Sequence, residues 1–143
     1  MIVFQTEYVD LIYNTEFQAV ELIWKGVFTT EEYQKTVDEA LRLMRVKKLS
    51  RWISDLRGLP SPPDHSLTWI GQQRFERVRK IPAMEVILIT GTKASVMIYG
   101  QKMADILDKK FPNAHIQLEI NRKNTHLWFQ SPYQNTYRHP SMI

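Results

Sequence analysis

The stretch 85–90, Glu-Val-Ile-Leu-Ile-Thr, is the feature that most restricts the fold of this chain. Its apolar residues follow one another without polar alternation, which indicates a strand buried on both faces. Strands of this kind lie inside parallel sheets that helices cover. The chain is therefore predicted to be an α/β domain.

The N-terminal part shows a different pattern, in which apolar and polar residues alternate. Segments 2–13 and 17–24 are separated by the turn residues Asn14 and Thr15. They predict an antiparallel hairpin with one solvated face. With further strands at 51–55 and 116–120, we expect a mixed, mostly parallel sheet of about five strands with about four helices.

The first helix has the clearest start signal. Thr29-Thr-Glu-Glu32 matches a capping box, in which the threonine hydroxyl and the glutamate carboxylate accept hydrogen bonds from free backbone amides. Apolar residues then recur at helical spacing toward Lys48. A third helix is expected after 91–95 and is stopped near Phe111.

The second helix is expected to run from Asp64 or Ser66, either of which can cap it, to about Lys80. Its apolar face is weaker than that of the first helix. Trp69 and Phe75 lie off this face, so we expect both side chains to be exposed.

A short last helix is expected from Asn121, as its cap, to Phe129. Residues 1–130 are then predicted to form a single domain. Residues 131–143 contain prolines and tyrosines without periodicity, which indicates an irregular C-terminal tail.

Composition narrows the classes of protein. The 143 residues include no cysteine, which excludes disulfides, thiolate zinc sites and a catalytic thiol. No apolar run has the length of a membrane span and no signal peptide is evident, so a cytoplasmic protein is expected. The net charge is +4. The excess of Lys and Arg over Asp and Glu lies after residue 50, and this part of the chain is expected to attract anionic partners.

The segment 51–63 predicts a strand, a sharp turn and a proline-stiffened loop. In an α/β domain, ligands usually bind at the carboxyl ends of the strands, so Asp55, Arg57 and Gly58 are candidate site residues. Asp55 and Arg57 are two residues apart and point the same way in an extended segment. Their charges form either a ligand-facing pair or a local salt bridge that stabilises the turn.

Thr92, Lys93 and Ser95 follow the next predicted strand at a helix start. Backbone amides there favour anions, and Lys93 adds charge. The spacing is not that of a P-loop, and ordinary helix capping also explains Thr92 or Ser95. Both loops are expected at the same sheet edge, where they define one candidate partner- or ligand-binding site.

A basic patch ends the second predicted helix, with Arg74, Arg77, Arg79 and Lys80. It is a second candidate site, for an anionic surface or a nucleic acid. Cations are also common at helix C-termini, and the absence of a nucleic-acid motif disfavours the nucleic-acid interpretation.

No pattern of residues indicates catalysis, a cofactor or a metal. Histidines 65, 115, 126 and 139 lack metal-ligand spacing, and no nucleophile elbow is present. We therefore expect no enzyme activity, no cofactor and no metal site.

Several short segments resemble the STAS domains, the fold of the anti-sigma-factor antagonists, and in particular their SpoIIAA-like branch. These segments are Ala19–Gly26, Thr29–Tyr33, Trp52–Arg57 and Thr125–Trp128. The resemblance covers nearly the whole chain. It implies a STAS-like α/β fold and a non-catalytic module that binds a protein partner or a ligand.

In signalling STAS domains a phosphorylatable serine or threonine follows an aspartate in the turn after this strand. Asp55 matches that aspartate, but Leu56, Arg57 and Gly58 follow it, and no hydroxyl stands at the switch position. The resemblance therefore does not extend to the phosphorylation mechanism.

The leading prediction is a STAS-like regulatory or protein-interaction domain that binds a protein partner or self-associates as a homodimer, and does not catalyse a reaction. The alternative is a small-molecule or lipid-binding domain with a pocket between the second helix and the sheet. The third prediction is anion or nucleic-acid binding through Arg74–Lys80.

Overall fold

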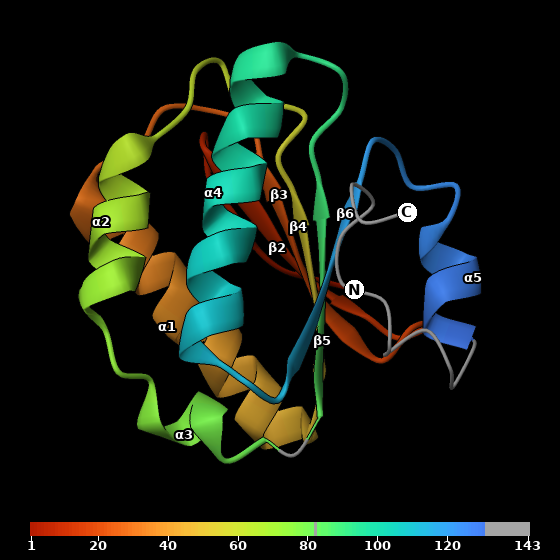
Figure 1. The fold of residues 1–143 in the computed structure, drawn as a ribbon. Coiled ribbons are helices and arrows are strands. Elements are labelled where there is room, and N and C mark those ends of the chain that lie inside the picture. The colour runs from red at the N-terminus through yellow and green to blue at the C-terminus, as the bar shows by residue number, and fades with distance from the viewer. Residues whose placement is uncertain (82, 131–143) are drawn as a thin grey trace.

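The computed structural model of the chain describes residues 1–81 and 83–130, and its central element is one sheet. The strands follow their order in the chain (Figure 1): β1 (Ile2–Gln5), β2 (Val9–Asn14), β3 (Ala19–Trp24), β4 (Arg51–Asp55), β5 (Met84–Ile89) and β6 (Ala114–Glu119). The pairs β1–β2 and β2–β3 are antiparallel, whereas β3 to β6 pair in parallel. The sheet is mixed and mostly parallel, as predicted.

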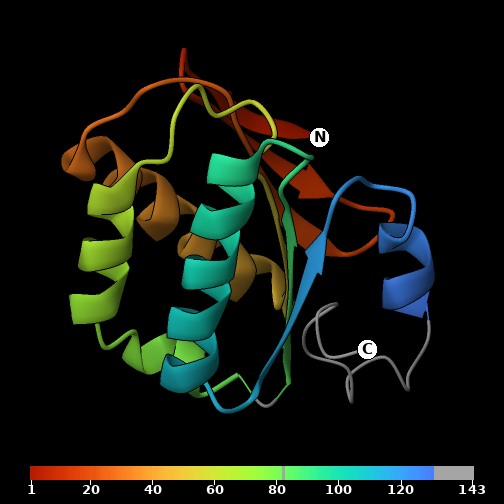
Figure 2. The ribbon, with the colours of Figure 1, turned by 45° about the horizontal axis from the view of Figure 1, so that its top comes forward.

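Helices cover both faces of the sheet, but unequally (Figures 1 and 2). Of the helices that the structure describes, one face carries α1 (Thr30–Lys47), α2 (Asp64–Gln72), α3 (Glu76–Arg79) and α4 (Ala94–Lys110), and the other carries α5 (Thr125–Gln130). Parallel strands placed in chain order require successive crossovers in one direction. Because such crossovers are right-handed, they put their helices on the same face.

Strand β5 is buried from both sides, which confirms the first prediction from the sequence. Val86 and Leu88 belong to the core under the helical layer. Ile87 and Ile89 pack on the opposite face in a smaller cluster with Trp128 of α5. A strand in this position has no solvated face, and this explains its continuous apolar sequence.

The capping box of α1 is also confirmed. Thr29 Oγ1 accepts a hydrogen bond from the Glu32 amide at 3.1 Å, and the Thr29 amide donates to Glu32 Oε1 at 2.8 Å. The helix ends at Lys48, which has a left-handed φ of 55° and donates its amide to the Arg45 carbonyl. Its two ends are thus fixed by local hydrogen bonds.

The predicted strand count was too low. The segment expected as one strand contains both β1 and β2, because Thr6 reverses the chain between them. Its Oγ1 accepts hydrogen bonds from the amides of Tyr8 and Val9 at 3.2 and 2.9 Å. The described part of the chain therefore has an N-terminal three-stranded antiparallel unit and six strands in total.

The second predicted helix is interrupted, and its caps were wrong. The chain leaves α2 at Gln73 with extended dihedrals, Phe75 has a φ of 47°, and only the four residues of α3 follow. Pro63 stands at the N-cap of α2 and makes no side-chain cap bond, and Ser66 Oγ donates to the Pro63 carbonyl instead. The described helices are thus three long ones and two short ones.

The interruption accounts for two further errors. Trp69 and Phe75 were expected to be exposed, but both are partly buried against the core. Trp69 meets Tyr33 edge-on at 5.7 Å between ring centroids, and Phe75 lies between Trp69 and Phe111 at 5.7 and 5.9 Å. The break in the helix turns Phe75 toward the interior, and these aromatic contacts stabilise the broken conformation.

Two further observations concern the chain as a whole. The tail predicted for residues 131–143 lies outside the described residues. Among the helices that are described, none is both long and apolar enough to cross a membrane.

The close packing of α4 on the sheet gives a test of this architecture. A Cβ added at Gly100 would lie 2.6 Å from Thr90 Cγ2, whereas one added at Gly71 in α2 meets nothing within 4 Å. Gly100→Ala is expected to lower the free energy of unfolding by about 1–3 kcal/mol. Gly71→Ala is expected to raise it by about 0.5–1 kcal/mol, through helix propensity.

Urea denaturation of the two variants measures this difference. Adding Thr90→Ser to Gly100→Ala removes the clashing methyl group, so this double variant should regain most of the lost stability. Equal effects of the two glycine substitutions would contradict the predicted contact.

Candidate functional site

The charged pair predicted at the end of β4 is a closed local ion pair. Arg57 donates to Asp55 from its backbone amide at 3.1 Å, from Nε at 2.9 Å and from an Nη at 2.7 Å. The Asp55 side chain is 7% exposed and that of Arg57 is 41% exposed. Hydrogen bonding to this carboxylate raises the pKa of the Arg57 guanidinium above its usual value.

The structure brings the two predicted loops together at this sheet edge. The Leu56 amide donates to the Ile89 carbonyl at 2.7 Å, and Lys93 Nζ donates to the Pro60 carbonyl at 2.8 Å. Gly91 has a φ of 71°, and a Cβ there would come within 3.2 Å of the Arg57 side chain. The Arg57 side chain therefore lies directly over the turn after β5.

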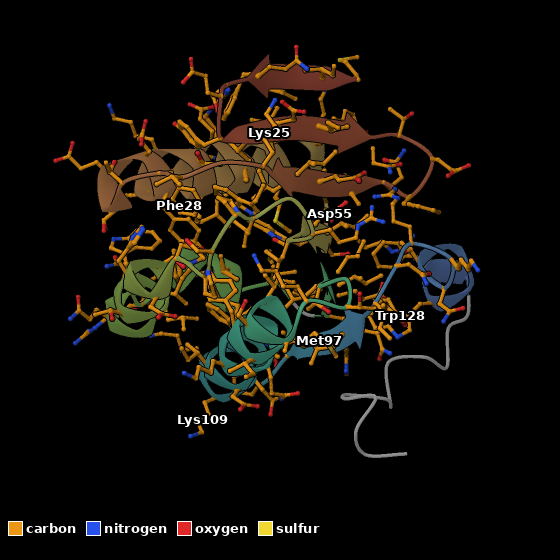
Figure 3. All side chains as sticks on the ribbon, turned by 90° about the horizontal axis from the view of Figure 1, so that it is seen from above. Lys25, Phe28, Asp55, Met97, Lys109 and Trp128 are labelled. Atoms are coloured by element: carbon orange, nitrogen blue, oxygen red, sulfur yellow. The ribbon has the colours of Figure 1, made fainter. Side chains whose placement is uncertain are left out.

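The remaining residues of this candidate site differ in their roles. Gly58 is packed against the end of β3, where a Cβ would lie 2.7 Å from the Trp24 carbonyl oxygen. Thr92 and Ser95 are exposed, and neither caps α4, whose N-cap residue is Lys93 and has no side-chain capping bond. Figure 3 looks down on this edge, with Asp55 between Lys25 and Met97.

The basic patch lies apart from this edge. Arg74 and Lys80 are exposed, and Arg77 and Arg79 belong to α3. Figures 1 and 2 place α3 beside the C-terminal end of α4, and the chain enters β5 from there. The patch is therefore at the opposite edge of the sheet from Asp55, and the two sites are separate.

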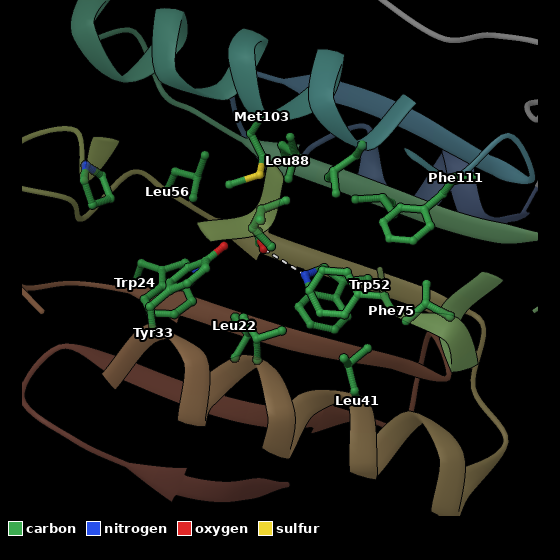
Figure 4. Close-up of a pocket in the computed structure, with 18 of the residues that line it drawn as sticks. Leu22, Trp24, Tyr33, Leu41, Trp52, Leu56, Phe75, Leu88, Met103 and Phe111 are labelled. Atoms are coloured by element: carbon green, nitrogen blue, oxygen red, sulfur yellow. Dashed lines mark hydrogen bonds between the residues drawn. The ribbon is translucent and has the colours of Figure 1, made fainter. Parts of the chain in front are cut away.

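The most distinctive feature of the described structure is an apolar cavity between the helical layer and the sheet, which we call the core cavity (Figure 4). The sheet contributes Leu22, Trp52, Val86 and Leu88 to its wall. The helices contribute Tyr33, Val37, Leu41, Ile70, Met103 and Leu107. Its volume is about 70 Å³, measured as the space open to the centre of a water molecule.

Two polar groups at the wall have hydrogen-bond partners within the protein. Ser54 Oγ accepts a hydrogen bond from Trp52 Nε1 at 2.9 Å, drawn as the dashed line in Figure 4. The Tyr99 hydroxyl is hydrogen-bonded to Ser66 Oγ. Burial raises the pKa of Tyr99 to about 12 and that of Tyr33 well above its usual value. Both phenols are neutral, and the wall offers an occupant apolar contact.

The histidines and carboxylates do not assemble into a metal centre where the structure describes them. His65 Nδ1 lies 3.0 Å from Thr30 Oγ1. In residues 1–81 and 83–130, no three side chains of the metal-ligating types converge on one point.

Comparison with models of known families and with curated proteins gave no match to this chain. The resemblance of its short segments to STAS domains therefore stays a prediction. The segment 125–128 of that resemblance lies in α5, where Trp128 is buried on the face opposite the core cavity.

No motif in the sequence marks the residues that line the core cavity, although a pocket between the second helix and the sheet was the alternative prediction. Trp24 and Trp52 line the cavity without belonging to any of the predicted site residues. The available signal was the stretch 64–80, which carries two aromatic residues beside a weak apolar face.

The buried phenol of Tyr99 predicts a loss of stability in alkali. Its folded pKa of about 12 exceeds the unfolded value of about 10. The contribution of the neutral phenol is therefore complete below pH 10 and is lost as the pH rises from 10 to 12. Tyr99→Phe should make the fall in unfolding free energy over this range shallower, by up to about 1 kcal/mol per pH unit.

Urea denaturation between pH 8 and about pH 11 tests this expectation. Tyr13→Phe is the control, because the Tyr13 hydroxyl bonds only an exposed Gln18 side chain at the rim of the sheet. Parallel pH profiles for Tyr99→Phe and the wild type would refute the assignment.

Proposed function

We propose that this chain is a non-catalytic domain that binds an apolar ligand in the core cavity. The observation that carries the proposal is the cavity itself, which lies between α2 and the sheet and is walled by apolar side chains. Protein interiors are normally close-packed. An unfilled space of this size lowers the free energy of unfolding by on the order of 1–2 kcal/mol, and a ligand that fills the space can restore this stability.

The wall restricts the chemistry of the occupant. Ser54 and Tyr99 have hydrogen-bond partners within the protein, so the ligand needs no polar group at that depth. The small volume favours a slim molecule over a rigid ring system. An unbranched alkyl chain fits these conditions, because each methylene group that it buries contributes about 0.8 kcal/mol.

Leu41 gives a direct test, because it lines the cavity from the partly exposed side of α1. Leu41→Trp extends an indole into the space and should weaken the binding of decanol about tenfold, which corresponds to the loss of about two buried methylene groups. The matched control is Leu43→Trp, since Leu43 is also partly buried on α1 but is not part of the wall.

Isothermal titration calorimetry with decanol measures the affinities, and native mass spectrometry of the purified protein detects a co-purified occupant. Decanol should bind the wild type and Leu43→Trp with a negative heat-capacity change, the mark of apolar burial. If decanol fails to bind the wild type, or binds Leu41→Trp with undiminished affinity, the core cavity is not a ligand site.

A second candidate function is that of a STAS-like regulatory domain that self-associates. The observation in its favour is an exposed apolar pair on the first turn of α4, Met97 at 41% and Ile98 at 57% exposure. The pair lies at the same edge as the Asp55–Arg57 turn (Figure 3). Exposed apolar side chains that adjoin a charged turn are typical of a protein-interaction surface.

Self-association through this pair predicts a specific effect of charge. Ile98→Lys should shift the protein from dimer to monomer in sedimentation equilibrium, because a buried unpaired ammonium disfavours the interface. Val46→Lys is the control, since Val46 is 56% exposed on a distant part of α1. A wild type that stays monomeric at high concentration would refute this candidate.

A further inference from the structure

A second depression adjoins the core cavity at the edge of the sheet where β5 and β6 begin; we call it the rim hollow. It is lined by Val78, Ile81, Met84, Lys110, Phe111, Pro112, Asn113 and Ala114. Four of these residues, Val78, Met84, Phe111 and Ala114, also line the core cavity. The two spaces are therefore adjacent and share part of their lining.

The two spaces differ in size and polarity. The space open to the centre of a water molecule is about 240 Å³ in the rim hollow and about 70 Å³ in the core cavity. Lys110 is among the residues that line the rim hollow, whereas the wall of the core cavity has no charged side chain. A narrow apolar space thus lies behind a wider and wetter one.

Basic residues are close to the rim hollow in the chain. Lys110, the one charged residue among those that line the hollow, donates a hydrogen bond from Nζ to the backbone carbonyl of Gln73, across the gap between α4 and the segment before α3. That segment continues in the sequence with Arg74, Arg77, Arg79 and Lys80. An anion in the rim hollow would therefore have Lys110 as its direct cationic neighbour.

We propose that the ligand of the core cavity is a single-chain anionic amphiphile, with its alkyl chain in the core cavity and its carboxylate or phosphate in the rim hollow beside Lys110. This inference rests on the proposed function. The basic segment Arg74–Lys80 then supplies a diffuse attraction, and Lys110 supplies the direct contact.

The chemistry of Lys110 fits this role. Its present partner is a neutral carbonyl, and a charge-assisted bond to an anionic oxygen is roughly twice as strong as a bond between neutral groups. The flexible lysine stem lets the ammonium exchange one acceptor for the other without moving the backbone. The anion stays partly hydrated there, so it avoids the cost of full burial.

The opposite orientation is disfavoured. At the far end of the core cavity an anion would meet Tyr33 and Tyr99, which are neutral phenols with no cation among the neighbouring wall residues. Burial of an ionised group without a cationic partner costs several kcal/mol. The headgroup therefore belongs in the rim hollow.

The test keeps the alkyl chain constant and changes the headgroup. Decanoate, decyl phosphate, decanol and decyltrimethylammonium are titrated into the full chain by calorimetry at low and high salt. The wild type should bind both anions at least about tenfold more tightly than decanol at low salt, and this advantage should shrink as salt screens the rim. The cation should bind more weakly than decanol.

Lys110→Met should lower the affinity for decanoate to that for decanol and leave the affinity for decanol unchanged. Lys110→Arg keeps the charge and should retain the preference. Lys102→Met is the matched control, because Lys102 is exposed on α4 and lines neither space. Thermal unfolding of each variant verifies that the fold is intact.

The outcomes separate the two proposals. If decanol and decanoate bind equally, or if Lys110→Met keeps the full preference for anions, the headgroup site is refuted while the proposed function stands. If none of the four compounds binds, the proposed function fails, and the headgroup site fails with it. A preference between decanoate and decyl phosphate identifies which anionic source the rim hollow accepts.

Discussion

The parallel pairing of β3, β4, β5 and β6 in chain order is the constraint on which the rest of the structure depends. Because each crossover has the same hand, the long helices share one face of the sheet. Side chains from several separate segments must then fill one interior. They do not fill it completely, and the core cavity remains where α1, α2 and α4 converge on the strands. On the other face, α5 packs Trp128 and Phe129 into a smaller cluster.

Local signals in the sequence predicted the parts of the fold that depend on local physics. The capping box at Thr29 and the apolar run in β5 each determine a structure through neighbouring residues, and both were predicted correctly. The split of the second helix was missed because it depends on distant partners. Phe75 takes a left-handed conformation while its ring packs against Trp69 and Phe111. The helix propensities of residues 64–80 do not include the stabilisation that these ring contacts provide.

The candidate sites show the same division. The adjacency of Asp55 and Arg57 is visible in the sequence, because two residues at this spacing share a side of the chain. Whether their charges face a ligand or one another depends on geometry, and the structure has them bonded to one another. The core cavity is a volume left between residues as distant as Leu22 and Ala114. Such a volume is the small difference between the space that the backbone encloses and the volume of the side chains that fill it, and no sequence motif encodes it.

The strand order also determines how the sheet can form. Each strand pairs with the strands that precede and follow it in the chain, so the sheet can grow by addition at one edge. The three antiparallel strands at the N-terminus are joined by tight turns, whereas each later strand follows a helical crossover, and parallel pairing of that kind is slow. The wall of the core cavity is complete only when α4 and β6 have been added, because Met103, Leu107 and Ala114 belong to it.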